Sequence, residues 1–280
     1  MKHVSILVPQ GNVSMVNIEG TYQILTHVNQ FMQMSGQPPV FKIQLVGLSR
    51  ETNLSTGLFT IKAEAVLDDV KNTDIIIIPA IFGKPADVLE NNNVFVPWLT
   101  RQHRGGAEVA SYCVGAFFLA QTGLLDGKQC ATHWAEASNF RAMFPHIDLV
   151  DDKIMTAEDG IYTSGGAYSY LNLLLYLIEK HAGREMAILI AKTFMIDIDK
   201  SSQSPFMIFE GQKAHQDEPV KKAQEYIEEN FSEKITVAEL ADQLAIGRRS
   251  LERRFKKATS NTVTEYIQRV KMEVAKKSLE

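Results

Sequence analysis

The sequence has little cysteine and lacks the patterns of several common site types. Its 280 residues include only Cys113 and Cys130, which excludes a disulfide framework and indicates reduced thiols, as in a cytosol. The seven histidines never cluster with these cysteines at metal-ligand spacing. Neither standard glycine loop for binding phosphate is present. We therefore expect no metal site and no cofactor.

Long apolar runs are also absent. No run approaches the ~18 residues that a membrane helix needs, and the first residues, MKHVSILVPQG, lack the anatomy of a signal peptide. No internal repeat or low-complexity segment stands out. With 45% hydrophobic and 22% charged residues, the chain is expected to be a globular protein of the cytoplasm without a membrane partner.

Charge is unevenly distributed along the chain. The net charge is −4, yet residues 247–280 carry ten Lys and Arg against four Asp and Glu, and the remainder is strongly acidic. A basic end on an acidic body indicates a polyanionic partner that is confined to that end.

Short apolar runs alternate with amphipathic stretches up to about residue 195. The runs are rich in β-branched residues and lack polar alternation, which is typical of parallel strands that are buried on both faces. We predict strands at Val4–Val8, Ile43–Leu48, Ile75–Ile78 and Val109–Tyr112. We predict helices at Tyr22–Met34, Phe95–His103, Ala116–Leu124 and Leu171–His181. This rhythm predicts an α/β fold with a parallel-sheet sandwich.

The pattern changes near residue 200. Periodicity is lost and prolines appear, so we predict a first domain over 1–196, a linker over 197–216 and a small all-α domain over 217–280. Part of the linker could pack on the first domain. Asp217 is a predicted N-cap for a helix over Val220–Phe231. Thr236 with Glu239, and Thr262 with Glu265, predict capping boxes for two further helices.

Residues 236–257, TVAELADQLAIGRRSLERRFKK, have the pattern of a helix-turn-helix. Leu240, Ala241 and Leu244 form an apolar seam, and residues 245–247 form a turn. Leu251 and Phe255, four residues apart, anchor the second helix to the same core. The second helix then presents a basic face that fits the major groove of DNA. An ordinary helical hairpin with a solvated charged face is the alternative.

Helix phase divides the basic face into two groups. One should face base edges and the other should touch phosphates or flank the groove. The predicted base-edge residues are Arg249, Glu252 and Arg253, and the predicted phosphate residues are Arg248, Ser250, Lys256 and Lys257. Arg254 is expected to pack instead on Glu225 or Glu228 of the preceding helix.

The segment EVASYCVGAF reads as strand, then Cys113, then helix. A nucleophile on such a turn needs small neighbours, and Ser111 and Gly115 are two residues away on each side. The helix dipole would favour the thiolate. Cys113 is therefore a candidate nucleophile, redox sensor or pocket residue. The alternative is a buried small hydrophobe, which is the usual role of a free cysteine.

Other candidates in the first domain are weaker. His133 is the best candidate base, although a histidine beside a tryptophan is more often a hydrogen-bonded structural residue. Gly165 and Gly166 lie next to a predicted helix and could sit near a ligand, but a tight turn explains them equally well. Cys130 is most simply a core residue.

The segments EVASYCVGAFFLAQTGLLDGKQCATHW and GIYTSGGAYSYLNLLLYLIEKHAG resemble the ThiJ/PfpI-like sensor domain of GlxA-type AraC-family regulators. SSQSPFMIF, the HQD motif and LERRFKKATSNTVTEYIQRVKMEVAKKSLE resemble the same group. The resemblance covers nearly the whole chain. It implies a flavodoxin-like, class I glutamine amidotransferase-like sandwich and an AraC-type DNA-binding domain. It further implies a homodimer that responds to a small molecule, with amino acids, amines or their derivatives as the suggested class.

Three departures from the resemblance weaken an enzymatic function. PfpI-type peptidases have His directly after the elbow cysteine, where this chain has Val114. Many enzymatic relatives have an acid after the first strand; the nearest positions here are Asn17 and Glu19, and the motif match favours Asn17, which cannot act as a base. The loop PAIFG lacks the paired glycines of an oxyanion hole. We therefore expect no catalytic residues, with Cys113 and His133 as vestigial candidates. The expected ligand-pocket residues are Asn17, Cys113, Val114, His133, Gly165 and Gly166.

AraC-type domains are similar to two tandem helix-turn-helix units, and this chain stops at Glu280, before a second unit. We therefore expect it to be part of a longer protein. Two function classes remain open: a ligand-responsive transcriptional regulator that binds the DNA major groove, and a cysteine-dependent small-molecule hydrolase or hydratase with an accessory helical domain.

Overall fold

The protein is described by a computed structural model that covers residues 1–280 except 55–56, 208–210, 212, 214, 260 and 280. The chain folds into two compact units, Met1–Pro205 and Phe206–Glu280. Each unit has its own hydrophobic core. Among the described residues, no helix is both long enough and apolar enough to cross a membrane.

A seven-stranded sheet forms the centre of the first unit, in the order β12-β13-β9-β7-β1-β3-β6. All neighbouring strands pair in parallel except β12 and β13. The apolar runs predicted as strands lie in its middle, where their side chains are buried on both faces. The strands are β1 (Lys2–Val8), β3 (Phe41–Gly47), β6 (Ala65–Val66), β7 (Ile75–Ile78), β9 (Glu108–Tyr112), β12 (Met155–Glu158) and β13 (Ile161–Ser164).

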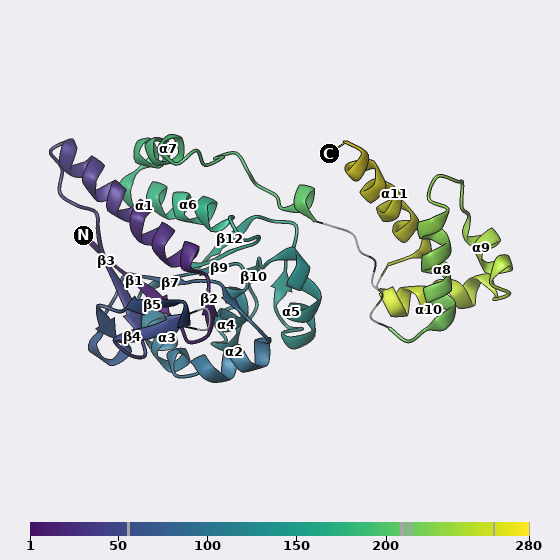
Figure 1. The fold of residues 1–280 in the computed structure, drawn as a ribbon, viewed down its shortest axis with the longest axis horizontal. Coiled ribbons are helices and arrows are strands. Elements are labelled where there is room, and N and C mark those ends of the chain that lie inside the picture. The colour runs from purple at the N-terminus through teal and green to yellow at the C-terminus, as the bar shows by residue number, and fades with distance from the viewer. Residues whose placement is uncertain (55–56, 208–210, 212, 214, 260, 280) are drawn as a thin grey trace. The chain divides into compact units, whose positions relative to one another are not determined.

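Helices cover both faces of this sheet (Figure 1). Helices α1 (Met15–Met34), α6 (Tyr170–Ala182) and α7 (Arg184–Thr193) lie on one face, and α2 (Pro85–Asn92), α3 (Phe95–Arg104) and α4 (Gly115–Gln121) lie on the other. Smaller elements complete the unit: α5 (Ala137–Met143), β2 (Asn12–Val13) with β8 (Ile81–Phe82), β4 (Glu51–Leu54) with β5 (Phe59–Lys62), and β10 (Gln129–Cys130) with β11 (Asp148–Leu149). This arrangement confirms the predicted α/β sandwich.

The ranges predicted from sequence differ from the structure in detail. The four predicted strands and four predicted helices are present, and α1 begins seven residues earlier than Tyr22, at Met15. Sequence analysis missed α7 and the pair β12 and β13. Strand β13 is only four residues long and follows polar β12 through a tight turn, so neither gives an extended apolar run.

A charged cluster fastens α6 to the sheet at the end opposite Cys113. Glu108 Oε1 accepts from Lys180 Nζ at 2.9 Å, and Glu108 Oε2 accepts from the Tyr162 hydroxyl at 3.0 Å. His181 Nε2 lies 3.3 Å from the same carboxylate. Burial alone would raise the pKa of Glu108, but its hydrogen bonds with His181 and Lys180 lower it to about 2. We interpret this cluster as a structural anchor, because the Glu108 carboxylate is bound by side chains from both α6 and β13.

The second unit is helical. It consists of α8 (Glu218–Glu229), α9 (Val237–Gln243), α10 (Arg248–Thr259) and α11 (Val263–Leu279). Asp217 caps α8 as predicted, and both predicted capping boxes are present, at Thr236 with Glu239 and at Thr262 with Glu265. The turn between α9 and α10 has Ala245 at φ +50°. These caps set where each helix begins and so fix the lengths of the connecting turns.

Residues 197–205, which we expected in the linker, belong to the first unit. Gln203 is buried, and its Nε2 donates to the carbonyls of Thr132 and Lys153 at 3.0 and 3.1 Å. The remainder of the predicted linker, from residue 206, belongs to the second unit.

Candidate functional site

Cys113 occupies a strained turn between β9 and α4. Its φ is +53°, a left-handed conformation that non-glycine residues rarely adopt. The backbone is held on both sides, since Cys113 N donates to the Ser164 carbonyl at 3.0 Å and the Cys113 carbonyl accepts from Thr132 Oγ1 at 3.0 Å. Gly115 is required here because a Cβ would lie 2.7 Å from the Pro79 carbonyl oxygen. The structure thus has the elbow geometry that the sequence predicted.

The Cys113 thiol is buried, with 1% of the residue exposed. Its pKa is raised to about 11, mainly by burial and also by the negative charge of Glu136, while the hydrogen bond with the Val114 backbone opposes the shift. The direction of the pKa shift is therefore opposite to the one that the helix dipole alone would give, because burial disfavours the charged thiolate.

Asn17 holds the loop that follows β7. The side chain is buried in the first turns of α1, and its Oδ1 accepts from Ala80 N at 3.1 Å. In the opposite direction, Ser14 N donates to the Ala80 carbonyl at 2.9 Å. Asn17 therefore clamps α1 to the loop that follows β7, and its side-chain oxygen serves as an acceptor for that loop.

His133 is used as a helix cap. Its Nδ1 accepts from Ala135 N at 3.1 Å, so the neutral ring carries its proton on Nε2. Burial lowers the pKa of His133, and Glu136 partly opposes this effect. The ring also packs against Trp134, with centroids 5.4 Å apart. The lone pair that a general base needs is already engaged, which favours the structural interpretation of this histidine.

Gly165 and Gly166 lie in the loop between β13 and α6, covered by Gln203. Gly166 N donates to Gln203 Oε1 at 3.1 Å, and a Cβ on Gly165 would collide with the Gln203 side chain. The close approach of Gln203 explains why glycine occurs at position 165. Sequence analysis did not identify Gln203, because its contacts are far away in the chain.

A small pocket adjoins the elbow. Its volume is about 60 Å³, and among the predicted pocket residues only Val114 lines it. The other lining residues are Ile81, Phe82, Gly83, Pro85, Val88, Phe117 and Glu136. This volume suits a few water molecules or a very small group and is well below the range typical of ligand pockets.

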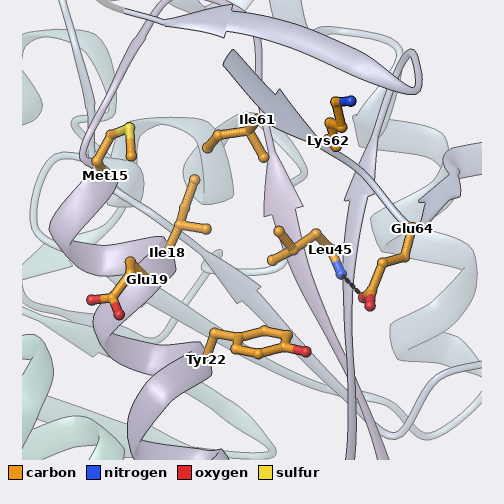
Figure 2. A pocket seen from close by; sticks show the side chains of 8 residues that line it. All are labelled: Met15, Ile18, Glu19, Tyr22, Leu45, Ile61, Lys62 and Glu64. Atoms are coloured by element: carbon orange, nitrogen blue, oxygen red, sulfur yellow. Dashed lines mark hydrogen bonds between the residues drawn. The ribbon is translucent and has the colours of Figure 1, made fainter. Parts of the chain in front are cut away.

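A larger pocket of about 280 Å³ lies between α1, β3 and β5 (Figure 2). It is mostly apolar and carries three charged side chains at its rim. Glu64 Oε2 accepts from Leu45 N at 3.0 Å and so replaces a strand partner at the edge of β3. The lining residues are Met15, Ile18, Glu19, Tyr22, Leu45, Ile61, Lys62 and Glu64. Four of them follow helical spacing on α1, but no motif in the sequence connects them to the other elements.

The second candidate site is the surface of α10. Leu251 and Phe255 are buried as predicted and pack with Leu240 and Ala241 of α9. This packing exposes the basic residues on the opposite side: Arg248, Arg249, Arg253, Lys256 and Lys257.

Two of the residues predicted to contact DNA, Arg248 and Glu252, form an ion pair with each other. Arg248 Nε lies 3.1 Å from Glu252 Oε1, which joins a predicted phosphate residue to a predicted base-edge residue. Ser250 is half-buried. Within the ranges that the structure describes, Arg249 and Arg253 make no ion pair, which leaves both guanidinium groups available at the surface.

The prediction for Arg254 is wrong. Its guanidinium forms a fork on Asp217, with Nη2–Oδ1 at 2.8 Å and Nε–Oδ2 at 2.9 Å, and does not contact Glu225 or Glu228. Glu228 is instead bound by Lys213 and by the Tyr266 hydroxyl. The actual partner is the N-cap of α8, 37 positions away in the chain, a separation for which sequence has no spacing rule.

Comparison with known proteins identifies both units. Residues 14–180 match the DJ-1/PfpI family, and residues 227–268 match the AraC family of bacterial regulatory helix-turn-helix proteins. The HTH-type transcriptional regulator GbdR of Pseudomonas aeruginosa is 26% identical over 273 residues, which cover 93% of this chain and 69% of GbdR. Isonitrile hydratase of Pseudomonas putida is 26% identical over 187 residues, 66% of this chain and 74% of the hydratase.

Solved structures agree on the fold of the first unit. The crystal structure of an AraC family transcriptional regulator from Pseudomonas putida superposes with a TM-score of 0.59 at 16% identity, over 69% of this chain and all of that chain. The expected combination of a ThiJ/PfpI-like domain with an AraC-type helix-turn-helix is confirmed.

Proposed function

The chain belongs to the DJ-1/PfpI family and carries an AraC-family helix-turn-helix, and we propose that a small molecule bound by its first domain controls how the second reads DNA. The chain is a DNA-binding transcriptional regulator. The observation that carries this function is the surface of α10, where Arg249 and Arg253 are exposed and unpaired within the described residues. Arginine in the major groove pairs with guanine edges.

The finer assignments follow from this function. Arg249, Glu252 and Arg253 would face base edges, with Arg248 released from Glu252 to reach a phosphate. Two copies would present two reading helices to successive major grooves, as a homodimer does. A location in the cytoplasm would give the protein access to DNA.

We place the effector in the pocket between α1, β3 and β5, because its volume is close to the range of known ligand sites. The Tyr22 ring and the carboxylates of Glu19 and Glu64 favour a cationic group. An amine or amino acid with an apolar part therefore fits, in agreement with the class expected from the family resemblance. Helix α1 also carries Asn17, so a ligand here would act on the helix that holds the elbow loop.

We expect one or more amines or amino acids to change the affinity of the chain for a promoter fragment by about 5-fold to 150-fold, the usual range of coupling between two sites. Fluorescence anisotropy with labelled genomic promoter fragments, at two salt concentrations, measures this effect. Random DNA of equal length is the control.

Two variants locate the effector. Glu19→Gln should weaken the response if the larger pocket binds the effector, whereas Val114→Trp, which fills the elbow pocket, should weaken it if the elbow does. An absence of sequence-selective binding at either salt concentration, with every compound tested, would contradict the regulator function.

A cysteine-dependent hydratase is the second candidate function. It is supported by the left-handed φ of Cys113 and by the similarity to isonitrile hydratase. Such an enzyme needs a thiolate and a base. The raised pKa of Cys113 and the capped Nδ1 of His133 argue against both requirements.

Thiol alkylation separates the two functions. With its pKa raised to about 11, Cys113 should react with iodoacetamide on the order of 100-fold more slowly at pH 7 in the folded chain than in urea. The rate should keep rising with pH well beyond 9. Mass spectrometry of the peptides distinguishes Cys113 from Cys130, which is also buried. Rapid alkylation of Cys113 with an apparent pKa below ~8.5 would shift the weight to the hydratase.

A further inference from the structure

Three described residues that precede α8 contact the helices of the second unit, and we call them the joining segment: Gly211, Lys213 and His215. Lys213 Nζ lies 2.6 Å from Glu228 Oε2 of α8, and the Tyr266 hydroxyl of α11 donates to Glu228 Oε1 at 2.7 Å. Gly211 is so close to the Tyr266 hydroxyl that a Cβ would collide with it. These contacts tie Gly211 and Lys213 to α8 and α11 within the second unit.

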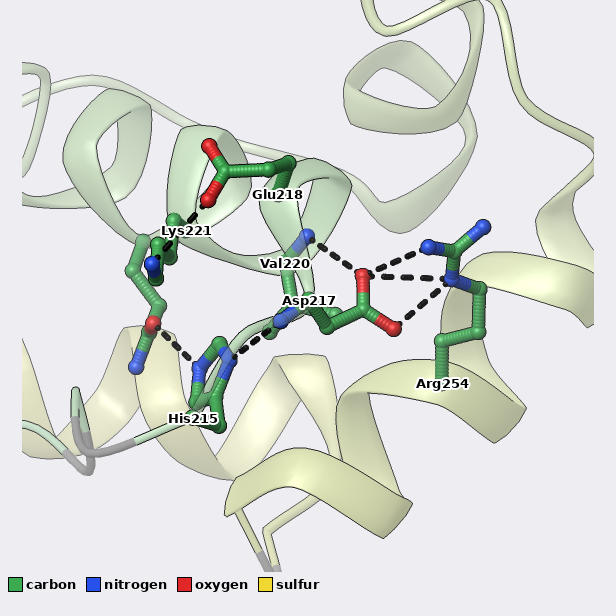
Figure 3. A network of polar contacts seen from close by, with 7 residues as sticks. His215, Asp217, Glu218, Val220, Lys221 and Arg254 are labelled. Atoms are coloured by element: carbon green, nitrogen blue, oxygen red, sulfur yellow. Dashed lines mark hydrogen bonds and ion pairs between the residues drawn. The ribbon is translucent and has the colours of Figure 1, made fainter.

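His215 continues the joining segment to the start of α8 (Figure 3). Its Nδ1 accepts from Asp217 N at 3.2 Å, and its Nε2 lies 3.0 Å from Oε1 of the buried Gln224 in α8. These two contacts hold His215 against α8 and fix the backbone N–H of Asp217 at the start of that helix.

Asp217 then connects two helices. Its Oδ1 accepts from Val220 N at 3.3 Å, which caps α8, and the same carboxylate holds Arg254 of α10 through three N–H···O contacts (Figure 3). Side-chain exposures of 25% for Asp217 and 37% for Arg254 show that the pair is partly shielded from solvent. Such a fork restrains rotation as well as distance, because both donors and both acceptors are fixed.

Arg254 lies between Arg253, which is exposed, and Phe255, which is buried. Restraining Arg254 therefore restrains the direction in which Arg249 and Arg253 leave α10. We propose that Asp217 is a positioning residue for DNA reading, which locks the recognition helix α10 to α8 and to the joining segment through Arg254. The proposal rests on the DNA-reading function above and identifies the contact through which the joining segment acts on α10.

Electrostatics and positioning give opposite expectations for Asp217→Asn. The substitution removes a negative charge, so charge alone should tighten binding to DNA. Asparagine remains a good N-cap, so α8 keeps its start. Loss of the fork should instead misalign a base contact. The reference site is the sequence that the full chain selects from a random pool, and Asp217→Asn should lower the affinity for this site by about tenfold. Affinity for random DNA should be unchanged or slightly tighter.

Glu218→Gln is the matched control, since it removes one negative charge at the next residue, where the carboxylate pairs, among the described residues, with Lys221. It should leave the preference for the selected site unchanged. Arg254→Lys keeps the charge but loses the fork, and it should behave like Asp217→Asn. If Arg254 acted directly on a phosphate, Arg254→Lys would retain affinity and Asp217→Asn would not reduce it.

Three results would overturn the proposal. The first is an equal preference for the selected site in Asp217→Asn and Glu218→Gln. The second is an equal loss of affinity for selected and random DNA in Asp217→Asn, as partial unfolding would cause. The third is an affinity of Arg254→Lys for the selected site equal to that of the parent chain. Hydrogen exchange of the α10 amides provides a separate readout, and we expect faster exchange in Asp217→Asn than in Glu218→Gln. If the parent chain selects no sequence, the DNA-reading function fails, while equal exchange in the two variants would still refute the lock.

Discussion

Replacing Arg249 and Arg253 together by alanine is expected to reduce the preference of the full chain for its selected DNA site by about 100-fold. Each arginine that pairs with a guanine contributes about 1–3 kcal/mol of discrimination against the wrong base. Both side chains are exposed on α10 and make no ion pair within the described residues. The measurement is competition between the selected site and random DNA, read by fluorescence anisotropy.

Lys257→Ala is the control for this prediction. Lys257 is exposed near the end of α10 and is assigned to a phosphate, so its loss should weaken both kinds of DNA by a similar factor. It should also reduce the slope of log affinity against log salt by about one. An unchanged preference in the double arginine variant would refute the base-edge assignment, even if overall affinity fell.

The local geometry of the second unit was predictable from sequence because its signals are short in range. The capping box of Thr236 and Glu239 spans three residues, and the anchors Leu251 and Phe255 are four residues apart. Periodicity and capping rules report on such distances directly. The elbow was predictable for the same reason, since the residues that define it lie within five positions of one another.

Contacts between distant segments could not be predicted in this way. Arg254 and Asp217 are 37 positions apart, and Gln203 meets Gly166 across 37 positions. Neither pair carries a spacing rule. The same limit applies to the larger pocket, whose residues come from a helix, two strands and the turn after β5, which only the fold brings together.

The pKa of Cys113 illustrates a different limit. Sequence identified the helix start beside the thiol, which lowers the pKa, but the depth of burial, which raises it, depends on the whole fold. The position of Cys113 at a helix start would by itself predict a lowered pKa, whereas the pKa is raised. A buried thiol with a raised pKa fits a structural role for Cys113 at this strained turn, as expected in a regulator.

Phe255→Ala is expected to unfold the second unit and to leave the first unit folded. Phe255 is fully buried and packs edge-on against Tyr266, with ring centroids 5.2 Å apart. Truncation of a buried phenylalanine costs about 3–5 kcal/mol, which is a large part of the stability of a small domain. Hydrogen exchange read by mass spectrometry should show loss of protection in α8, α9, α10 and α11 and unchanged protection in the central sheet.

The two units have separate hydrophobic cores, which is why the loss should stay local. Met272→Ala is the control, because Met272 is 61% exposed on α11 and its truncation should leave protection unchanged. Phe255→Ala should abolish binding to selected and random DNA alike, whereas the double arginine variant should keep its affinity for random DNA. Retained protection of α10 in Phe255→Ala would mean that the helix is held mainly by its polar contacts, with Asp217 foremost among them.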